Sequence, residues 1–423
     1  MQTYTLPYGQ TQLDIALPDT FQVDLIMPKA LETPDDVNQI IQTALSNPIG
    51  SLAPMDFPRD ATVGIAINDK TRPVAKPNPL LTLVTALAEW GFDPTRMRVF
   101  IGSGTHMPMS EEELHNLLPD KVIGNVDVIL HDCDSSPLMS LGKTDYGTPI
   151  KVNQAYVECD LKFVIGNIEP HHFMGFSGGV KTAAIGLAGR ETINANHAML
   201  TQPNTLAGRY SINPMRQDIE EIGRKMGIQF CLGTVLNENK EILRAYFGNP
   251  KMVMQKAIPD VRAMFATTLP APYDLVIASP GGAPKDINLY QAQKGLTNAA
   301  RIARDDAWVL LLAACPEGSG SQGYESFITQ TGSHQAVVDK FKSGFFEVGP
   351  HKAFQIARDA LRTRMILVSD IPPQSVTRWQ LTPSQPDKLE SLLNWLTEQL
   401  PTDARVAVLP AATRTMTEIL NGD

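Results

Sequence analysis

The sequence contains few cysteines. Its 423 residues include four, Cys133, Cys159, Cys231 and Cys315, and no two of them form a CxxC pair. A disulfide framework or a zinc ribbon needs closely and regularly spaced cysteines. We therefore expect reduced, structural thiols, as in a cytoplasmic enzyme.

Long apolar runs and an excess of positive charge are also missing. No stretch of about 18 or more apolar residues is present to span a membrane, and the first residues lack the basic and apolar regions of a signal peptide. The formal net charge is −9, which argues against nucleic acid or an anionic membrane as a partner. A small anionic substrate stays open, because a few basic side chains can reverse the field inside a cleft.

Apolar runs typical of buried strands alternate with helical patterns along the chain. Near-continuous apolar strands are usually buried on both faces, so the pattern predicts an α/β fold with mostly parallel sheets. The chain also exceeds the length at which one core keeps growing. The predicted strands are 61–69, 96–104, 125–132, 160–168, 273–280, 307–315, 364–370 and 405–410, and the clearest helices are 78–91, 110–120 and 211–227.

A Thr/Pro-rich stretch at 264–274 predicts the boundary between two domains. The first is an N-terminal α/β domain over 1–266, which 402–423 can also join, and the second is a smaller C-terminal α/β domain over 272–400. In open α/β sheets, ligands bind beyond the carboxyl ends of the strands. Polar loops follow four predicted strands, so we expect them to line one interdomain cleft; they are NDKTRP, GSGTHMP, NIEPHHF and SPGGAPKD.

Two histidines in these loops, His106 and His171, are candidates for acid–base catalysis. Each follows a strand end within a few residues, and imidazole accepts and returns protons near neutral pH. The alternative is a histidine hydrogen-bonded for structure alone, which is less expected for two residues in equivalent places. His172 is next to His171, and adjacent side chains rarely converge on one metal ion.

The segment Ser177-Gly178-Gly179-Val180-Lys181 resembles a phosphate-binding turn without matching the Walker A pattern. Its backbone amides are suited to one phosphate group. Lys181 is then either a neutralising charge, an amine nucleophile for a covalent cofactor, or a solvated surface lysine.

The remaining candidates are ambiguous by themselves. Asp69 and Arg72 share one turn, where the guanidinium is suited to a carboxylate or phosphate but can also form a surface pair with the aspartate. Gln291 and Lys294 share one helix face, which faces either an anionic ligand or solvent. His197 alone is typical of a structural histidine on a helix.

Together these motifs resemble the nickel-pincer lactate racemase family. The resemblance rests on GTH with His106, on EPHHFMGFSGGVK with His171 and Lys181, on His197 and on YQAQKG, and it covers essentially the whole chain. It implies two α/β domains around a cleft. It also implies inversion of a 2-hydroxy acid by reversible hydride transfer to a nickel pincer nucleotide, through a 2-keto acid.

The resemblance assigns a role to each candidate residue. Lys181 would tether the cofactor as a thioamide, His197 would bind its nickel, and His106 and His171 would be the paired acid and base. Asp69, Ser177, Gly178 and Gly179 would lie on the cofactor side, and Arg72, Gln291 and Lys294 would hold the substrate, with Tyr290 lining its pocket. Cofactor biosynthesis proteins would be needed as maturation partners.

Two positions depart from the family. Val180 stands where the lactate enzymes commonly carry a basic residue, and His172 stands where an aromatic residue is usual. The first change would weaken a contact to the cofactor phosphate, and both leave the identity of the hydroxy acid open. Two other functions also stay open: a zinc-type hydrolase using His106, His171 and His197, and a non-catalytic receptor for small anions.

Overall fold

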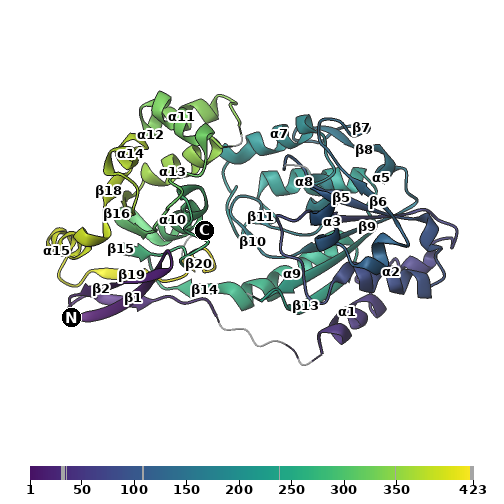
Figure 1. The fold of residues 1–423 in the computed structure, drawn as a ribbon, viewed down its shortest axis with the longest axis horizontal. Coiled ribbons are helices and arrows are strands. Elements are labelled where there is room, and N and C mark those ends of the chain that lie inside the picture. Colours follow the sequence, from purple (N-terminus) through teal and green to yellow (C-terminus); the bar gives the residue numbers. More distant parts are fainter. Residues whose placement is uncertain (30–33, 35, 107–108, 238, 348, 420–423) are drawn as a thin grey trace. The chain divides into compact units, whose positions relative to one another are not determined.

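The computed structural model describes residues 1–29, 34, 36–106, 109–237, 239–347 and 349–419. The chain forms two compact units. The middle unit comprises residues 30–264, and the terminal unit comprises residues 1–29 together with 265–423. Each has a mainly parallel six-stranded sheet, so the predicted α/β fold class is confirmed. Figure 1 shows the elements of both units along the chain.

The sheet of the middle unit has the strand order β13-β12-β9-β4-β5-β6. All neighbours are parallel except β13, which runs antiparallel to β12. The strands of this unit are β4 (Val63–Asn68), β5 (Met97–Gly102), β6 (Asp127–Leu130), β7 (Leu138–Lys143), β8 (Pro149–Asn153), β9 (Leu161–Asn167), β10 (Pro170–His171), β11 (Gly175–Phe176), β12 (Phe230–Leu236) and β13 (Ile242–Gly248).

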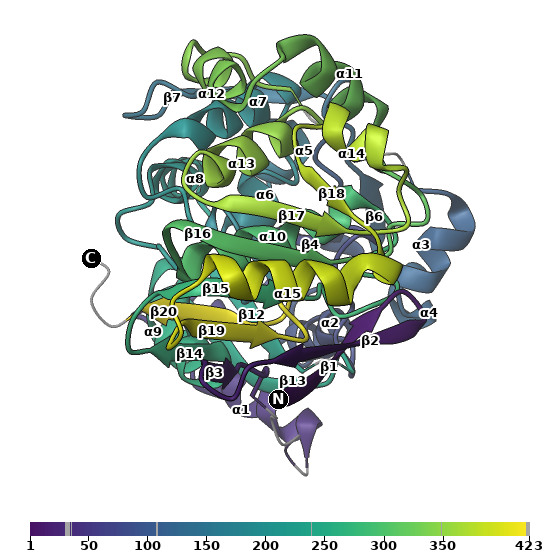
Figure 2. The same ribbon diagram turned by 90° about the vertical axis from the view of Figure 1, so that its left-hand side faces the viewer.

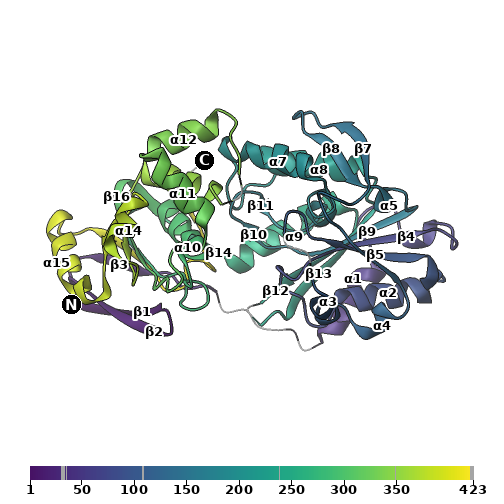
Figure 3. The ribbon, with the colours of Figure 1, turned by 45° about the horizontal axis from the view of Figure 1, so that its top comes forward.

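Helices cover both faces of this sheet, with α1 and α2 on one side and α7 and α8 on the other (Figures 1 and 3). The core on the first side is formed by the alternate residues Val63 and Ile65 of β4 together with Leu83 and Leu87 of α2. The helices are α1 (Val37–Ser46), α2 (Pro79–Glu89), α3 (Glu111–Leu117), α4 (Asp120–Ile123), α5 (Gln154–Val157), α6 (Lys181–Ala184), α7 (Arg190–Ala198), α8 (Pro214–Lys225) and α9 (Pro250–Phe265).

Local sequence signals explain where several helices begin. The Asn78 side chain accepts a hydrogen bond from the N–H of Leu80, and Pro79 occupies the first turn of α2. Ser110 and Glu113 form a reciprocal capping box at the start of α3. These are the places where the sequence predicted helices.

The terminal unit contains a fully parallel sheet with the order β18-β17-β16-β15-β19-β3, which Figure 2 shows with α15 in front of it. Its strands are β1 (Gln2–Tyr8), β2 (Thr11–Leu17), β3 (Gln22–Leu25), β14 (Ala266–Leu269), β15 (Tyr273–Ala278), β16 (Ala303–Leu312), β17 (Arg364–Val368), β18 (Thr382–Ser384), β19 (Arg405–Leu409) and β20 (Met416–Ile419). Its helices are α10 (Leu289–Ile302), α11 (Gln322–Thr331), α12 (His334–Lys342), α13 (His351–Ala360), α14 (Pro373–Arg378) and α15 (Leu389–Gln399).

The structure differs from the predicted domain ranges at both ends of the chain. Residues 1–29 belong to the terminal unit, because β3 pairs with β19 and Leu6 and Ile15 of the β1–β2 hairpin are buried in the same core as Leu275 of β15. Residues 402–423 do not join 1–266, because β19 pairs with β15 inside the sheet of the terminal unit.

Candidate active site in the middle unit

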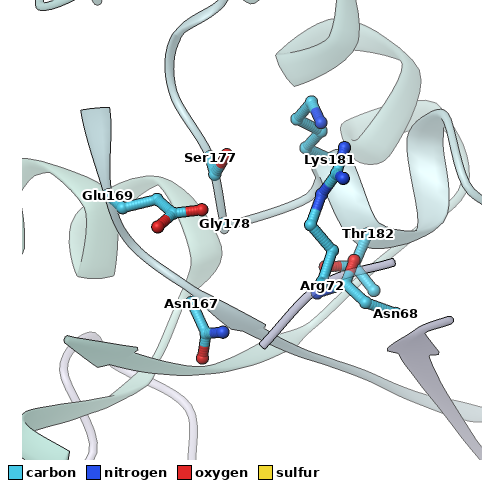
Figure 4. Close-up of a pocket in the computed structure, with 8 residues that line it drawn as sticks. All are labelled: Asn68, Arg72, Asn167, Glu169, Ser177, Gly178, Lys181 and Thr182. Atoms are coloured by element: carbon cyan, nitrogen blue, oxygen red, sulfur yellow. The ribbon is translucent and has the colours of Figure 1, made fainter. Parts of the chain in front are cut away.

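Three of the polar loops predicted from the sequence follow adjacent strands, because β9, β4 and β5 are neighbours in one sheet. A pocket lies at this edge, and Figure 4 shows the side chains around it. It is lined by Asn68, Arg72, Asn167, Glu169, Ser177, Gly178, Lys181 and Thr182. The fourth loop, 279–286, follows β15 of the terminal unit, so the prediction that all four share a cleft stays a prediction.

Asp69 orients His106. Its buried carboxylate, 2% exposed, accepts a hydrogen bond from His106 Nδ1 at 2.8 Å and another from the hydroxyl of Thr71 at 2.6 Å. Burial raises the pKa of Asp69, but these hydrogen bonds lower it more, so the carboxylate is ionised at neutral pH. With its Nδ1–H held by the carboxylate, His106 has its lone pair on Nε2, which can accept a proton.

Arg72 is available for a ligand in the pocket. Its guanidinium makes long hydrogen bonds within its own turn, 3.5 Å to the carbonyl and 3.4 Å to the hydroxyl of Thr71, while Asp69 bonds to His106. The surface Asp69–Arg72 pair considered from the sequence is therefore not formed. In Figure 4 the guanidinium lies beside Lys181, so a guanidinium and an amine share one side of the pocket.

His171 is held in the opposite tautomer to His106. Its Nδ1 accepts the backbone N–H of Met174 at 3.2 Å, so its proton is on Nε2 when the ring is neutral. Burial, followed by the charges of Lys181 and neighbouring groups, holds the pKa of His171 well below its usual value. Phe173 packs edge-on against the ring, with centroids 4.6 Å apart.

Both glycines after Ser177 are required by the structure. Gly178 has φ +80°, and a Cβ there would lie 2.8 Å from a carbon of Ile168. Gly179 has φ +60°, and a Cβ there would lie 2.8 Å from the guanidinium of Arg216. The buried Ser177 hydroxyl has no hydrogen-bond partner among the described residues, although it lines the pocket.

Lys181 begins α6, which lies against the strand ends through close contacts at two glycines. A Cβ at Gly102 or at Gly166 would lie 2.8 or 2.7 Å from oxygen atoms of Thr182. Burial, then the charge of Arg72 and that of Arg216, lowers the pKa of Lys181 to about 7. The amine is thus neutral in part of the molecules at physiological pH, as a nucleophile requires.

His197, on α7, is arranged as a metal ligand can be. Its Nδ1 donates to the Ile193 carbonyl at 2.9 Å, which leaves the lone pair on Nε2, the usual arrangement of a metal-binding imidazole. Burial, then the charge of Lys181, lowers the pKa of His197 to about 4. The ring therefore stays unprotonated at neutral pH.

A zinc site formed by the three histidines is not supported. Within the described residues, the one group of three candidate metal ligands that come within 4.8 Å of one another is Asp132, Cys133 and Asp134. Arg190 pairs with Asp134 there at 2.5 Å. His106, His171 and His197 do not form such a group, so a metal at His197 would need most of its ligands from elsewhere.

The two departures from the family have structural explanations. Val180 is buried, 3% exposed, and packs against α8, where a Cβ at Gly223 would lie 2.5 Å from Val180. A long basic side chain has no room there. The His172 ring stacks on His171 with centroids 4.7 Å apart, so it occupies the place of an aromatic ring.

The predicted substrate residues of the second domain lie together on α10 in the terminal unit. Lys294 donates to the Gln291 amide oxygen at 2.9 Å, and the Lys352 amine lies 5.0 Å from the centre of the Tyr290 ring. Their participation in one site with Arg72 stays a prediction.

Sequence reasoning missed four pocket residues, Asn68, Asn167, Glu169 and Thr182. The first two had a usable signal, because each is the last residue of its strand. The structure adds a contact that the sequence did not predict, the bond between Asp69 and His106; the place of Asp69 on the cofactor side stays a prediction. The prediction of unpaired structural cysteines agrees with the structure, because all four are free thiols with buried side chains. In the described part of the chain no helix has the length and apolar character to cross a membrane.

Residues 8–208 match the lactate racemase N-terminal domain, and residues 269–416 match the lactate racemase C-terminal domain. The chain belongs to the lactate racemase family. The family relationship predicted from the motifs is therefore confirmed.

Two relatives of the chain are named lactate racemases. A lactate racemase from Thermoanaerobacterium thermosaccharolyticum is 29% identical over 379 residues, 88% of each chain. One from Lactiplantibacillus plantarum is 28% identical over 348 residues, 80% of this chain and 81% of the relative. The solved lactate racemase apoprotein from T. thermosaccharolyticum superimposes with a TM-score of 0.88, covering 99% of this chain and all of the other at 25% identity. A Thermotoga maritima structure, 17% identical with a TM-score of 0.59, shares the fold over 90% of this chain and 97% of its own.

Proposed function

We propose that this protein is a racemase or epimerase of a 2-hydroxy acid that depends on a nickel pincer nucleotide attached to Lys181. The observation that supports this most is the placement of Lys181. Its amine has a pKa of about 7 and shares a pocket with Arg72 and the Ser177–Gly178 turn. A nucleophilic amine beside an anion-binding turn is suited to a tethered nucleotide.

The residues of the middle unit fit such a cofactor. The Ser177 hydroxyl is buried without a partner in the described structure, and the two glycines after it bring the backbone close to the pocket. Lys181 would form the tether, and His197 would donate Nε2 to the nickel. His197 is the one protein ligand that we propose, and one is enough for a metal that the nucleotide itself would hold. When bound, the cofactor supplies the acceptor for the hydride of the substrate Cα.

The two histidines would handle the protons of the substrate oxygen. His106 takes the hydroxyl proton on Nε2, and the ionised Asp69 stabilises the positive charge that His106 then carries. His171 would donate its Nε2–H as a hydrogen bond to the oxygen in its second position, reached when the flat 2-keto acid turns over; acting as a base there requires the other tautomer, with the proton on Nδ1. Arg72 would hold the substrate carboxylate. Gln291, Lys294 and Tyr290, on α10 of the terminal unit, stay predicted substrate-binding residues.

This set of side chains supports a 2-hydroxy acid as the substrate class. A carboxylate for Arg72, an adjacent hydroxyl for the histidines and a hydrogen on the same carbon define a 2-hydroxy acid. Two named relatives are lactate racemases, so lactate is the first substrate to test, followed by malate and by longer aliphatic, aromatic and sugar acids. We also propose a cytoplasmic location and cofactor biosynthesis proteins as maturation partners.

The test is a chiral assay of this panel on protein matured with the cofactor pathway, with intact mass and nickel measured on the same sample. We expect one acid to be interconverted and an adduct on Lys181 that is absent from Lys181→Ala. Matured protein without adduct and nickel would refute the cofactor proposal. Fully loaded protein that binds a hydroxy acid without interconverting it would favour the anion receptor.

A further inference from the structure

Arg216 of α8 lies directly behind the turn that carries Ser177, and sequence reasoning gave it no role. Its side chain is completely buried. Nη1 donates to the carbonyl oxygens of Phe176 at 2.9 Å and Gly178 at 3.2 Å. Nη2 donates to the same Gly178 carbonyl at 3.2 Å.

The charge of Arg216 is balanced within its own helix. Glu220, one turn further on, accepts from Nε at 2.8 Å and from Nη2 at 2.5 Å. The carboxylate offsets part of the guanidinium charge, and the five hydrogen bonds of the fork fix its position against the turn. A lysine has three donors on one atom and cannot reproduce the five bonds that the three nitrogens of the planar fork make to the two carbonyls and the carboxylate.

These bonds divide the polar groups of the turn between two sides. The carbonyls of Phe176 and Gly178 point inward to Arg216, while the Ser177 hydroxyl lines the pocket. Gly179 lies so close to the guanidinium that a Cβ would come within 2.8 Å of Nη2. The second glycine of the motif is therefore required by Arg216 as well as by its own positive φ.

We propose that Arg216 is a positioning residue that holds the Phe176–Gly179 turn in the conformation that binds the phosphate of a pyridinium mononucleotide. This inference rests on the proposed function in one respect: that function supplies the class of ligand, a pyridinium mononucleotide. Without the guanidinium, two buried carbonyls lose their partners, and the turn relaxes to satisfy them elsewhere. Phosphate binding is then weakened although no phosphate contact was removed.

The test separates positioning from general stability by varying the ligand together with the protein. Binding of nicotinic acid mononucleotide and of its phosphate-free nucleoside to the unloaded full-length protein is measured by calorimetry, well below the unfolding temperature. In the wild type we expect the phosphate to improve affinity by about 10-fold or more, as a charge-assisted hydrogen bond does. Arg216→Met and Arg216→Lys should reduce this improvement to less than about 3-fold while leaving the affinity for the nucleoside unchanged.

Two further variants complete the experiment. In Gly179→Ala the new Cβ would lie 2.8 Å from Nη2 of Arg216 and 2.8 Å from Cγ of Met254, so this variant disturbs the guanidinium without deleting it. It should show the same selective loss, which keeps the test decisive if Arg216→Met does not fold. Ile222→Ala removes a buried side chain elsewhere on α8 and should lower the unfolding temperature while keeping the phosphate effect. Equal loss for both ligands in the Arg216 variants, or no phosphate effect in the wild type, would overturn the proposal. The chiral assay described above tests the proposed racemase function separately, and its outcome does not depend on this binding experiment.

Discussion

Replacing Asp69 by asparagine tests the proton-transfer role of His106 with almost no change in shape. The amide oxygen of the new side chain can still accept the hydroxyl of Thr71, but its NH₂ group would face His106 Nδ1, which the carboxylate now holds at 2.8 Å. The ring would then accept at Nδ1 and carry its proton on Nε2, the atom that must act as the base. A hydrogen bond to a charged group contributes about 1.5–3 kcal/mol, so kcat should fall about 10- to 150-fold.

The assay is the chiral conversion of the preferred hydroxy acid by loaded protein, with the adduct on Lys181 quantified in each sample. Thr71→Val is the matched control, because it removes the hydroxyl that donates to Asp69 and keeps the contact between the carboxylate and His106. It should lower kcat less than Asp69→Asn does, because the Nδ1–H of His106 stays on the carboxylate. If Asp69→Asn were fully loaded and retained more than half of the wild-type kcat, the assignment of His106 as the oriented base would be wrong.

Three other predictions follow from the geometry. Arg72→Ala should lower kcat/KM at low substrate about 10-fold or more without changing the adduct on loading, and an unchanged kcat/KM would contradict the carboxylate clamp. Gly175→Ala should lower the free energy of unfolding by about 3 kcal/mol or more in urea titrations, because its φ is +75° and its Cβ would lie 1.7 Å from the carbonyl oxygen of Arg209. The control is Gly147→Ala, with φ +86° and no atom within 4 Å of the new Cβ, which should lower the free energy of unfolding by about 1 kcal/mol. Burial, then the charge of Lys294, lowers the pKa of Lys352 from 10.5 to about 7. Between these pH values the unfolded chain binds more protons than the folded one, so the free energy of unfolding rises with pH, and Lys352→Met should reduce that slope by up to about 1.4 kcal/mol per pH unit. An unchanged slope would show that Lys352 is not desolvated.

The regular elements were largely predictable because the signals are local. Each of the eight predicted strands corresponds to an observed strand, as 61–69 does to β4 and 405–410 does to β19. The place of a strand in a sheet was less accessible. Pairing of β3 with β19 joins residues almost four hundred positions apart, and nothing in residues 22–25 specifies that partner.

The site was predictable where its chemistry is concentrated in one segment. GFSGGVK carries the turn and the amine, and its resemblance to the lactate racemase motif was specific enough to place the chain in its family. Arg216 was not predictable, because an arginine on an amphipathic helix normally faces solvent. Only packing shows that this one is buried behind the turn.

The sequence by itself determined the α/β class, the strand ends where the polar loops lie, and the family, since these depend on periodicity and on short motifs. The tertiary structure decided how those groups can act. It set the tautomers of His106, His171 and His197 through single hydrogen bonds, and it lowered the pKa of the Lys181 amine by burial beside Arg72. Proton positions depend on distances of about 3 Å between residues far apart in the chain, and these distances exist only after folding.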